Sequence, residues 1–274
     1  MARRSQSTTA RTNRRPTATG QDLREQILAD FATLRVPLNS EELDTLLAQA
    51  GREGLSHLEF THRLVAEQAR QRRERSIARR IQQAQFQELK TLADFDWEFN
   101  AQAIDRTQIE ELATCAFIGR KDNLVLVGQS GVGKSRIAQA LGQNACVLGL
   151  RVRYTTSGKL LVDLKASLAD QTLPQRVRYY AGFDLLIVDE FGFDKIERDE
   201  APQAANLFYK IIDARYQQCS TALITNIDFD IWADYLGDPP LAMALLDRLV
   251  DRAIIVKIKG KSYRAARARN AETS

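Results

Sequence analysis

The stretch NLVLVGQSGVGKS, residues 123–135, decides the fold. An apolar run ending at Val127 leads into a glycine-rich loop and then into a helix-forming segment, the context that the phosphate-loop pattern G-x-x-x-x-G-K-[ST] requires. Glycines let backbone N–H groups converge on phosphate oxygens, and the helix N-terminus adds partial positive charge. We expect Lys134 to contact the β and γ phosphates of a nucleoside triphosphate and the Ser135 hydroxyl to ligate Mg²⁺. The candidate nucleotide-binding residues here are Gly128, Gln129, Ser130, Gly131, Val132, Gly133, Lys134, Ser135 and Arg136.

A pair of acids ends a second apolar run, DLLIVDEFG, at residues 184–192. The carboxyl ends of parallel strands border the crevice in which such sheets bind ligands. Asp189 is predicted to hold Mg²⁺ through its water shell, and Glu190 to polarise an attacking water. By itself the pair is slightly more typical of a helix N-cap and its first turn. Following the loop lysine, Lys134, it indicates a nucleoside triphosphate hydrolase.

The run ALITNID, residues 222–228, supplies a third polar group. Its strand is predicted to end at Thr225, so the amide of Asn226 would enter the same crevice near the γ-phosphate and orient the attacking water. An asparagine that merely turns the chain after a strand has the same spacing.

Arginines near the last strand are candidates for a charge supplied to a neighbouring subunit. Such an arginine stabilises transition-state charge in phosphoryl transfer. Arg248 in LLDRLVDRA is the first choice, and Arg252 and Arg215 are the alternatives. Each is also typical of a surface ion pair, for which Asp247 and Asp251 are available partners of Arg248.

Strand and helix patterns alternate along the second part of the chain, which predicts an α/β fold with a five-stranded parallel sheet. Most of the strand candidates are continuous apolar runs, as expected for strands covered on both faces. The predicted strands are Asn123–Val127, Leu150–Thr155, Asp184–Val188, Ala222–Thr225 and Ala253–Ile258. The predicted helices are Lys134–Leu148 with Gly149 after its end, Gly158–Leu168, Pro202–Tyr216 and Leu241–Val250.

The first ninety or so residues have a helical pattern instead. Capping boxes at Asn39 with Glu42 and at Ser56 with Glu59 predict two helix starts. An earlier helix would place its apolar residues on one face, and the third would run from His57 to about Gln87. The apolar residues of the first helix are Leu23, Ile27, Phe31 and Leu34. The predicted domains are a disordered basic arm at 1–20, a helical DNA- or partner-binding domain at 21–92, an ATPase domain at 93–266 and a tail at 267–274.

Charge is distributed unevenly along the 274 residues, although the net charge is only +4. Basic residues cluster in 1–21, between positions 70 and 80, and in 257–269. Such clusters indicate contact with a polyanion or a solvated surface. The candidate DNA-binding residues are Arg70, Arg73 and Arg80. No apolar stretch is long enough to span a membrane, and the N-terminus lacks the apolar region of a secretory signal. We therefore expect a cytoplasmic protein, although the arm also has the composition of a mitochondrial transit peptide.

Missing motifs narrow the class of nucleotide hydrolase. The fourth strand is followed by NID, whereas a GTPase would read guanine with NKxD. An LSGGQ-like signature, typical of transport ATPases, is also absent. The catalytic acid adjoins the acid predicted to hold Mg²⁺, which favours an AAA+ ATPase.

Across residues 22–266 the chain resembles the IstB-like ATP-binding proteins, helper ATPases of bacterial insertion sequences that are related to DnaC-type helicase loaders within the AAA+ class. The motifs that carry the resemblance are FDWEF, GQSGVGKSRIAQALGQNAC, GLRVRYTT, DLLIVDEFG, LFYKIIDARY, ALITN and LLDRLVDRAIIVKIKGKSYR. The resemblance implies an ATPase that assembles on double-stranded target DNA, bends it and delivers it to a partner transposase, with hydrolysis regulating assembly. The resemblance also implies a bacterial cytoplasmic protein that is associated with the nucleoid when it is bound to DNA.

The resemblance also assigns roles to single residues. It implies a phosphate loop at Gly128, Gly133, Lys134 and Ser135, a Walker B pair at Asp189 and Glu190, and a sensor at Asn226. It further implies an arginine acting in trans at Arg248, and an arginine near the nucleotide or the next subunit at Arg264. Two features depart from the family. Ser135 and Arg136 stand where Thr-His is common, and the 16 residues after Ile258 are too few for a helical lid.

Two other functions remain open on the sequence. A DnaC-type replicative helicase loader would share all of the ATPase motifs and would differ in preferring single-stranded DNA. A nucleotide-dependent switch without turnover would need no catalytic acid, and the intact Lys134, Asp189 and Glu190 argue against it.

Overall fold

The computed structural model describes residues 19–192 and 201–266. It contains two compact units, one up to Arg75 and one from Ser76 onward, and the boundary between them falls inside a helix. The predicted tail at 267–274 and all but the last two residues of the predicted arm at 1–20 lie outside the described residues.

The first unit is built from helices whose starts are set by side-chain caps. They are α1 (Gly20–Thr33), α2 (Ser40–Glu53) and the first part of α3 (His57–Ala84). Both predicted capping boxes form, and a third at Thr19 and Asp22 opens α1. Gly54, in the left-handed conformation with φ 63°, ends α2.

The first helix, α1, is exposed along its length. The helix forms, but none of its residues is buried, and Leu23 keeps half of its surface exposed. Leu43 of α2 is fully buried instead, with Leu38 just before that helix. The periodicity of its apolar residues therefore predicted the helix correctly. α3 ends at Ala84, three residues before the predicted end.

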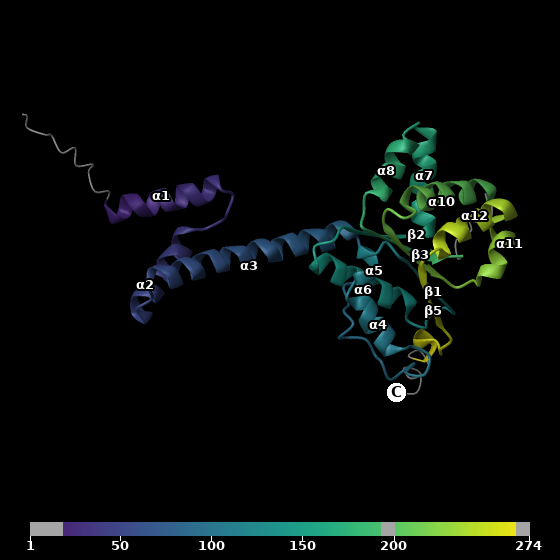
Figure 1. The fold of residues 1–274 in the computed structure, drawn as a ribbon, viewed down its shortest axis with the longest axis horizontal. Helices are drawn as coiled ribbons and strands as arrows, with labels where there is room; N and C mark the ends of the chain where they lie inside the picture. The colour runs from purple at the N-terminus through teal and green to yellow at the C-terminus, as the bar shows by residue number, and fades with distance from the viewer. Residues whose placement is uncertain (1–18, 193–200, 267–274) are drawn as a thin grey trace, which may run out of the picture. The chain divides into compact units, whose positions relative to one another are not determined.

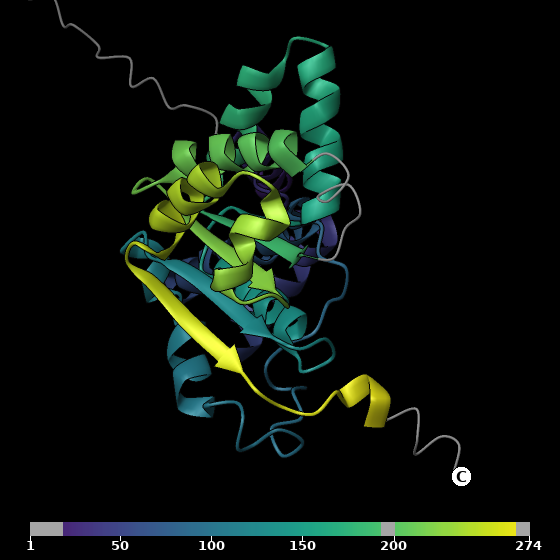
Figure 2. The same ribbon diagram turned by 90° about the vertical axis from the view of Figure 1, so that its right-hand side faces the viewer.

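The second unit contains a sheet of five parallel strands, as predicted. The strands are β1 (Asn123–Gly128), β2 (Val152–Thr156), β3 (Leu185–Phe191), β4 (Ser220–Thr225) and β5 (Ala253–Ile258). Their order is β2-β3-β4-β1-β5, and Figure 2 shows β5 alongside β1. The carboxyl ends of β1, β4 and β3 are therefore neighbours at one edge of the sheet. This order brings the glycine loop after β1, the Asn226 turn after β4 and the acids of β3 to the same edge.

Helices cover both faces of this sheet, which explains the continuous apolar strands. Figure 1 shows α4, α5 and α6 on one side and α10, α11 and α12 on the other. The helices are α4 (Arg106–Ala113), α5 (Ala116–Gly119), α6 (Lys134–Val147), α7 (Ser157–Ala169), α8 (Leu173–Ala181), α10 (Ala201–Arg215), α11 (Trp232–Leu236) and α12 (Pro239–Val250), with a 3-10 turn at Phe229–Ile231. Two buried apolar clusters result, one on each face.

The four predicted helices of this unit all form, and Gly149 follows the end of α6 with φ 97°, as expected for a helix terminator. The sequence did not predict α4, α5, α8 and α11, which are short. None of the helices in the part of the chain that the structure describes is long and apolar enough to cross a membrane.

The segment between α3 and α4 lies against the sheet as a wall. Phe95 and Trp97 pack against the buried cluster on the α6 side. Two amides of α6 hold the same segment further upstream: the Glu88 backbone N–H donates to the Gln139 side chain at 3.0 Å, and Gln143 donates to the Glu88 carbonyl at 3.2 Å. The aromatic and acidic stretch FDWEFN is thus fixed next to the first turn of α6.

Candidate nucleotide-binding site

The loop between β1 and α6 has the backbone that its glycines predict. Gly131 and Gly133 lie in the left-handed region, with φ 84° and 104°. A Cβ at Gly131 would lie 2.2 Å from the Ser262 hydroxyl oxygen, and one at Gly128 would lie 2.3 Å from the carbonyl oxygen of Ile258. The loop therefore needs glycine both for its dihedral angles and for its close packing against the C-terminal segment.

Lys134 lies at the first position of α6 and is directed back over this loop. Its ammonium donates to the carbonyl oxygens of Gly128 at 2.6 Å and Gln129 at 2.9 Å. Burial lowers the pKa of Lys134, and the nearby negative charge of Asp189 opposes that shift. A cation at the N-terminus of a helix, beside a ring of backbone groups, is suited to hold an anion such as phosphate.

Asp189 is buried at the end of β3 and is the centre of a hydrogen-bond network. One carboxylate oxygen, Oδ1, accepts from the Ser135 hydroxyl at 3.0 Å and from the Glu190 backbone N–H at 2.7 Å. The other, Oδ2, accepts from the Tyr154 hydroxyl at 2.7 Å. The structure thus brings together Ser135 and Asp189, the two residues predicted to share Mg²⁺. Sequence reasoning did not find Tyr154.

Glu190 has an unusual backbone for a residue with a side chain. Its φ is 60°, in the left-handed region that costs a non-glycine residue free energy. The pairing register between β3 and β4 shifts here: Val188 opposes Leu223, but Phe191 opposes Thr225, so the two acids form a bulge. Bulges re-aim side chains, and this one leaves Asp189 buried while Glu190 is exposed at the cavity.

Asn226 completes the polar edge of the sheet between the loop and the acids. It follows β4, and its amide oxygen lies 2.9 Å from where a Cβ on Gly192 would be. The side chain is exposed and lines the same cavity as Lys134 and Glu190. The geometry places Asn226 where the sequence predicted it, at the crevice beside the acids.

A cavity of about 510 Å³ lies over these residues. Its lining includes the loop, the start of α6, Asp189, Glu190 and Asn226, together with Phe95, Phe99, Tyr263 and Arg264. Tyr263 and Arg264 belong to the segment after β5, which crosses the loop: the Tyr263 N–H donates to the Gly131 carbonyl at 2.9 Å, and Arg264 donates to the Ser130 hydroxyl at 3.1 Å. Arg264 therefore lies at the loop, as its predicted role requires.

Aromatic residues from the segment before α4 and the segment after β5 form part of the cavity lining. Phe99 and Tyr263 meet edge to face with their ring centroids 5.0 Å apart. The buried amide of Asn100 holds the two segments together, since it donates to the Lys261 carbonyl and accepts from the Lys261 N–H, both at 3.0 Å. The run FDWEFN was a signal for this aromatic wall, but its partner lies far away in the sequence.

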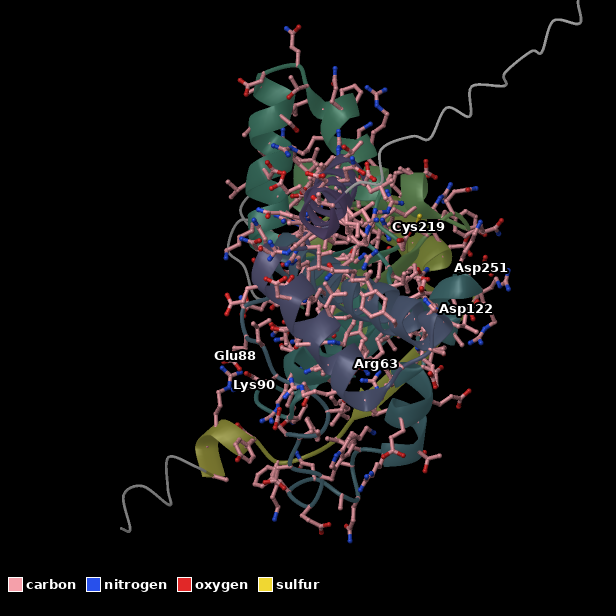
Figure 3. All side chains as sticks on the ribbon, turned by 90° about the vertical axis from the view of Figure 1, so that its left-hand side faces the viewer. Arg63, Glu88, Lys90, Asp122, Cys219 and Asp251 are labelled. Carbon is pink, nitrogen blue, oxygen red and sulfur yellow. The ribbon has the colours of Figure 1, made fainter. Side chains whose placement is uncertain are left out.

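The rim of the cavity carries both signs of charge. Arg136 packs over the ring of Phe95, with its guanidinium carbon 5.6 Å from the ring centroid, and donates to the Asp94 carbonyl. Glu88 and Lys90 form an ion pair at 2.5 Å, and Figure 3 shows their labelled side chains next to each other. Arg136 thus fastens the segment before α4 onto the first turn of α6.

The three arginines considered for a role in trans have different environments. Arg248 on α12 lies outside the cavity, where it pairs with Asp213 at 2.7 Å and packs over the ring of Tyr209 at 4.8 Å. Arg252 is exposed. Arg215 is almost completely buried, and its guanidinium donates to the Thr221 hydroxyl and the Tyr180 carbonyl. The burial of its guanidinium argues against the alternative role of Arg215 in trans.

The predicted DNA-binding arginines all lie on α3 and none lines the cavity. Arg70 forms ion pairs with Glu67 and Glu74, each at 2.7 Å, which offset its charge. Arg73 is exposed and Arg80 is half-buried. Of the three, Arg73 has the side chain most available to a phosphate backbone.

The site fits a nucleoside triphosphate with Mg²⁺. Lys134 at the start of α6 supplies positive charge for phosphates, and a hydroxyl bonded to a buried carboxylate supplies the oxygen ligands that Mg²⁺ prefers. The cavity beyond the loop is aromatic and large enough for a base and sugar, since ligand pockets typically measure about 300–1,000 Å³.

Comparison with known proteins also points to nucleotide binding. The model of the family described as IstB-like ATP binding protein matches residues 29–271. A protein of Pseudomonas aeruginosa, described as an ATP-binding protein of insertion sequence IS21, is 34% identical over 241 residues, which cover 88% of this chain and 89% of that protein. One of Geobacillus stearothermophilus, described as an ATP-binding protein of insertion sequence IS5376, is 31% identical over 243 residues, 88% of this chain and 94% of that one.

Among solved structures, the DnaC helicase loader is 20% identical with a TM-score of 0.44, and the match covers 60% of this chain and 98% of that chain. At this low TM-score the likeness indicates neither the activity nor the partners of the present protein. The family match extends over most of the chain, and the IS21 relative is similar over almost its whole length. The chain therefore belongs to the family of IstB-like ATP binding proteins.

Proposed function

We propose that this protein is a Mg²⁺-dependent ATPase that assists the transposition of an insertion sequence. It would assemble on duplex target DNA in an ATP-dependent oligomer, bend the DNA and deliver it to the transposase of the same element, acting on the nucleoid in the bacterial cytoplasm. The observation that carries the ATPase part is the convergence of Lys134, the Ser135–Asp189 pair and Glu190 on one cavity. The relatives described as ATP-binding proteins of insertion sequences support the transposition part.

Different residues of the cavity would bind the phosphates, hold Mg²⁺ and activate the attacking water. Lys134 and the loop amides would bind the phosphates, and Ser135 and Asp189 would hold Mg²⁺. When bound, Mg²⁺ supplies charge neutralisation to the phosphate oxygens. Glu190 is exposed at the cavity, so its carboxylate is free to accept a proton from water, and Asn226 beside it would orient that water.

The aromatic part of the cavity lining would hold the nucleoside. Phe95, Phe99 and Tyr263 offer apolar ring surface to a base, and Arg264 reaches the loop through its bond to Ser130. The part played by Arg248 would differ. Since it lies outside its own cavity, it would act on the nucleotide of the adjacent subunit in the assembled form.

DNA binding would use the exposed cations of α3, above all Arg73, together with the basic residues that follow β5. Contacts of this kind are made to phosphates, so they are largely independent of sequence and weaken steeply with salt. The experiment is a titration of duplex and single-stranded DNA at low and moderate salt, with and without ATP. Preference for duplex supports the transposition role, whereas preference for single strands would favour a helicase loader.

Two substitutions test the ATPase assignment. Lys134→Ala should abolish ATP binding, because it removes the ammonium that contacts the phosphates. Glu190→Gln should bind ATP as the wild-type protein does but should not hydrolyse it. The variant should therefore accumulate in the assembled form. The measurements are nucleotide titration, phosphate release and sedimentation with duplex DNA. Undiminished turnover in Glu190→Gln would remove this residue from the catalytic role.

A further inference from the structure

We propose that Tyr154 is a positioning residue for the metal-binding carboxylate of Asp189. Its hydroxyl would hold one carboxylate oxygen, so that the other stays directed toward the Ser135 hydroxyl. The inference rests on the proposed function, since it assigns a role toward the Mg²⁺ that Ser135 and Asp189 would bind.

The hydrogen bonds of Asp189 are distributed unequally between its two oxygens. Oδ1 accepts from Ser135 at 3.0 Å and from the Glu190 N–H at 2.7 Å, and both donors belong to the nucleotide site. Oδ2 accepts from Tyr154 at 2.7 Å, and this donor comes from the neighbouring strand. Rotation of the carboxylate would exchange the two oxygens, and the Tyr154 bond opposes that rotation.

The position of Tyr154 is fixed by the sheet and by packing. It lies in β2 and pairs with Ile187 of β3, two residues before Asp189. Only 3% of its surface is exposed, and its ring lies against Phe86, with centroids 6.3 Å apart. Phe86 is itself wedged against α6, since a Cβ on Gly142 would lie 2.8 Å from its ring. The hydroxyl is therefore held in place independently of whatever fills the cavity.

A donor behind a metal-binding carboxylate has a measurable effect on the metal. Residues that hydrogen-bond the ligands of a metal fix their orientation, and loss of such a partner typically weakens metal affinity by about 10–100-fold. A buried carboxylate oxygen that loses its donor is also unfavourable in an apolar environment. Removal of the Tyr154 hydroxyl should thus act on Mg²⁺ and leave the loop contacts of the nucleotide intact.

The chain supplies a matched control in Tyr180 of α8. This tyrosine is also 3% exposed, and its hydroxyl also donates to a carboxylate oxygen, that of Asp163, at 2.7 Å. Asp163 does not line the nucleotide cavity. Tyr154→Phe and Tyr180→Phe therefore delete the same kind of bond from equally buried rings, at the candidate metal site and away from it.

The test is a titration of the full chain with a fluorescent ATP analogue at increasing free Mg²⁺, with an EDTA series as the metal-free reference and a melting curve for each variant. We expect Tyr154→Phe to bind the analogue normally in EDTA and to need at least about tenfold more Mg²⁺ for half-maximal enhancement of binding. Tyr180→Phe should have the Mg²⁺ requirement of the unchanged protein, even if both variants melt at a lower temperature.

Three results would overturn the inference. An unchanged Mg²⁺ requirement in Tyr154→Phe removes the positioning role, and so does an equal shift in both variants, which would reflect general loosening. Weakened binding of Tyr154→Phe in EDTA alone would assign the hydroxyl to the nucleotide and not to the metal. If the unchanged protein binds no nucleotide, or binds it without regard to Mg²⁺, the proposed function fails with the inference. If the wild-type protein binds the nucleotide in a Mg²⁺-dependent way and Tyr154→Phe has the same Mg²⁺ requirement, the inference alone is rejected and the proposed function stands.

Discussion

Arg215 should be a major determinant of stability in the second unit. Its side chain is 1% exposed and donates to four acceptors: the Thr221 hydroxyl at 3.0 Å, the carbonyls of Tyr180 at 2.6 Å and Phe183 at 2.9 Å, and the carbonyl of Ser220. Burial lowers its pKa to about 10, so the guanidinium remains charged at neutral pH. One side chain thus satisfies three backbone carbonyls, those of Tyr180 in α8, Phe183 before β3 and Ser220 at the start of β4.

Arg215→Met keeps most of the side-chain volume and removes every donor. Each carbonyl left unpaired in the interior costs about 1 kcal/mol or more, so three of them should lower the free energy of unfolding by about 3 kcal/mol. Methionine carries no charge, so the variant also avoids the cost of burying a guanidinium, and this offsets part of the loss from the unpaired carbonyls.

Urea unfolding followed by circular dichroism measures this loss. Arg252→Met is the control, because Arg252 is exposed and forms only a long ion pair with Asp122 at 3.6 Å, which is worth about 0–1 kcal/mol. A loss below about 1 kcal/mol for Arg215→Met would refute the reasoning. ATP turnover per folded molecule should be unchanged in Arg215→Met, since this arginine is far too buried to act on another subunit.

Three further changes test the site. Gly128→Ala should lower the melting temperature and abolish the increase in melting temperature that ATP causes. The new Cβ would lie 2.3 Å from the Ile258 carbonyl oxygen and would separate β5 from β1. An ATP-induced increase of normal size would contradict this. Asn100→Ala removes two hydrogen bonds to Lys261, worth about 1 kcal/mol each, and should weaken ATP binding in a titration; unchanged affinity would show that the aromatic wall does not depend on them. Arg248→Ala should bind ATP normally and lose turnover only when duplex DNA assembles the protein, so an equal loss without DNA would exclude action in trans.

The phosphate loop and the sheet could be predicted because their signals are local. The loop pattern, the apolar strands and the capping boxes each depend on residues within a few positions of one another, and the five strands form close to their predicted limits. The acids of β3 were also placed correctly at the sheet edge, since parallel strands all present their carboxyl ends on one side.

The parts that were not predicted depend on contacts between distant residues. The bond between Tyr154 and Asp189 requires two strands to pair in one register, and the bond between Asn100 and Lys261 joins positions 161 residues apart. The left-handed backbone of Glu190 results from a bulge that only the pairing of β3 with β4 creates. The burial of Arg215, an alternative candidate for action in trans, could not be predicted, because a lone arginine in the sequence gives no sign of being enclosed.

The short segment after β5 has a practical consequence for dissecting the molecule. Ser262 packs on Gly131, the Tyr263 N–H bonds to the same loop, and Arg264 reaches Ser130, so the segment serves as a clasp across the turn that precedes α6. A fragment trimmed at the last strand would keep every sequence hallmark of an ATPase and lose this clasp. A fragment for nucleotide-binding studies should therefore start no later than Ser76 and end no earlier than Arg264.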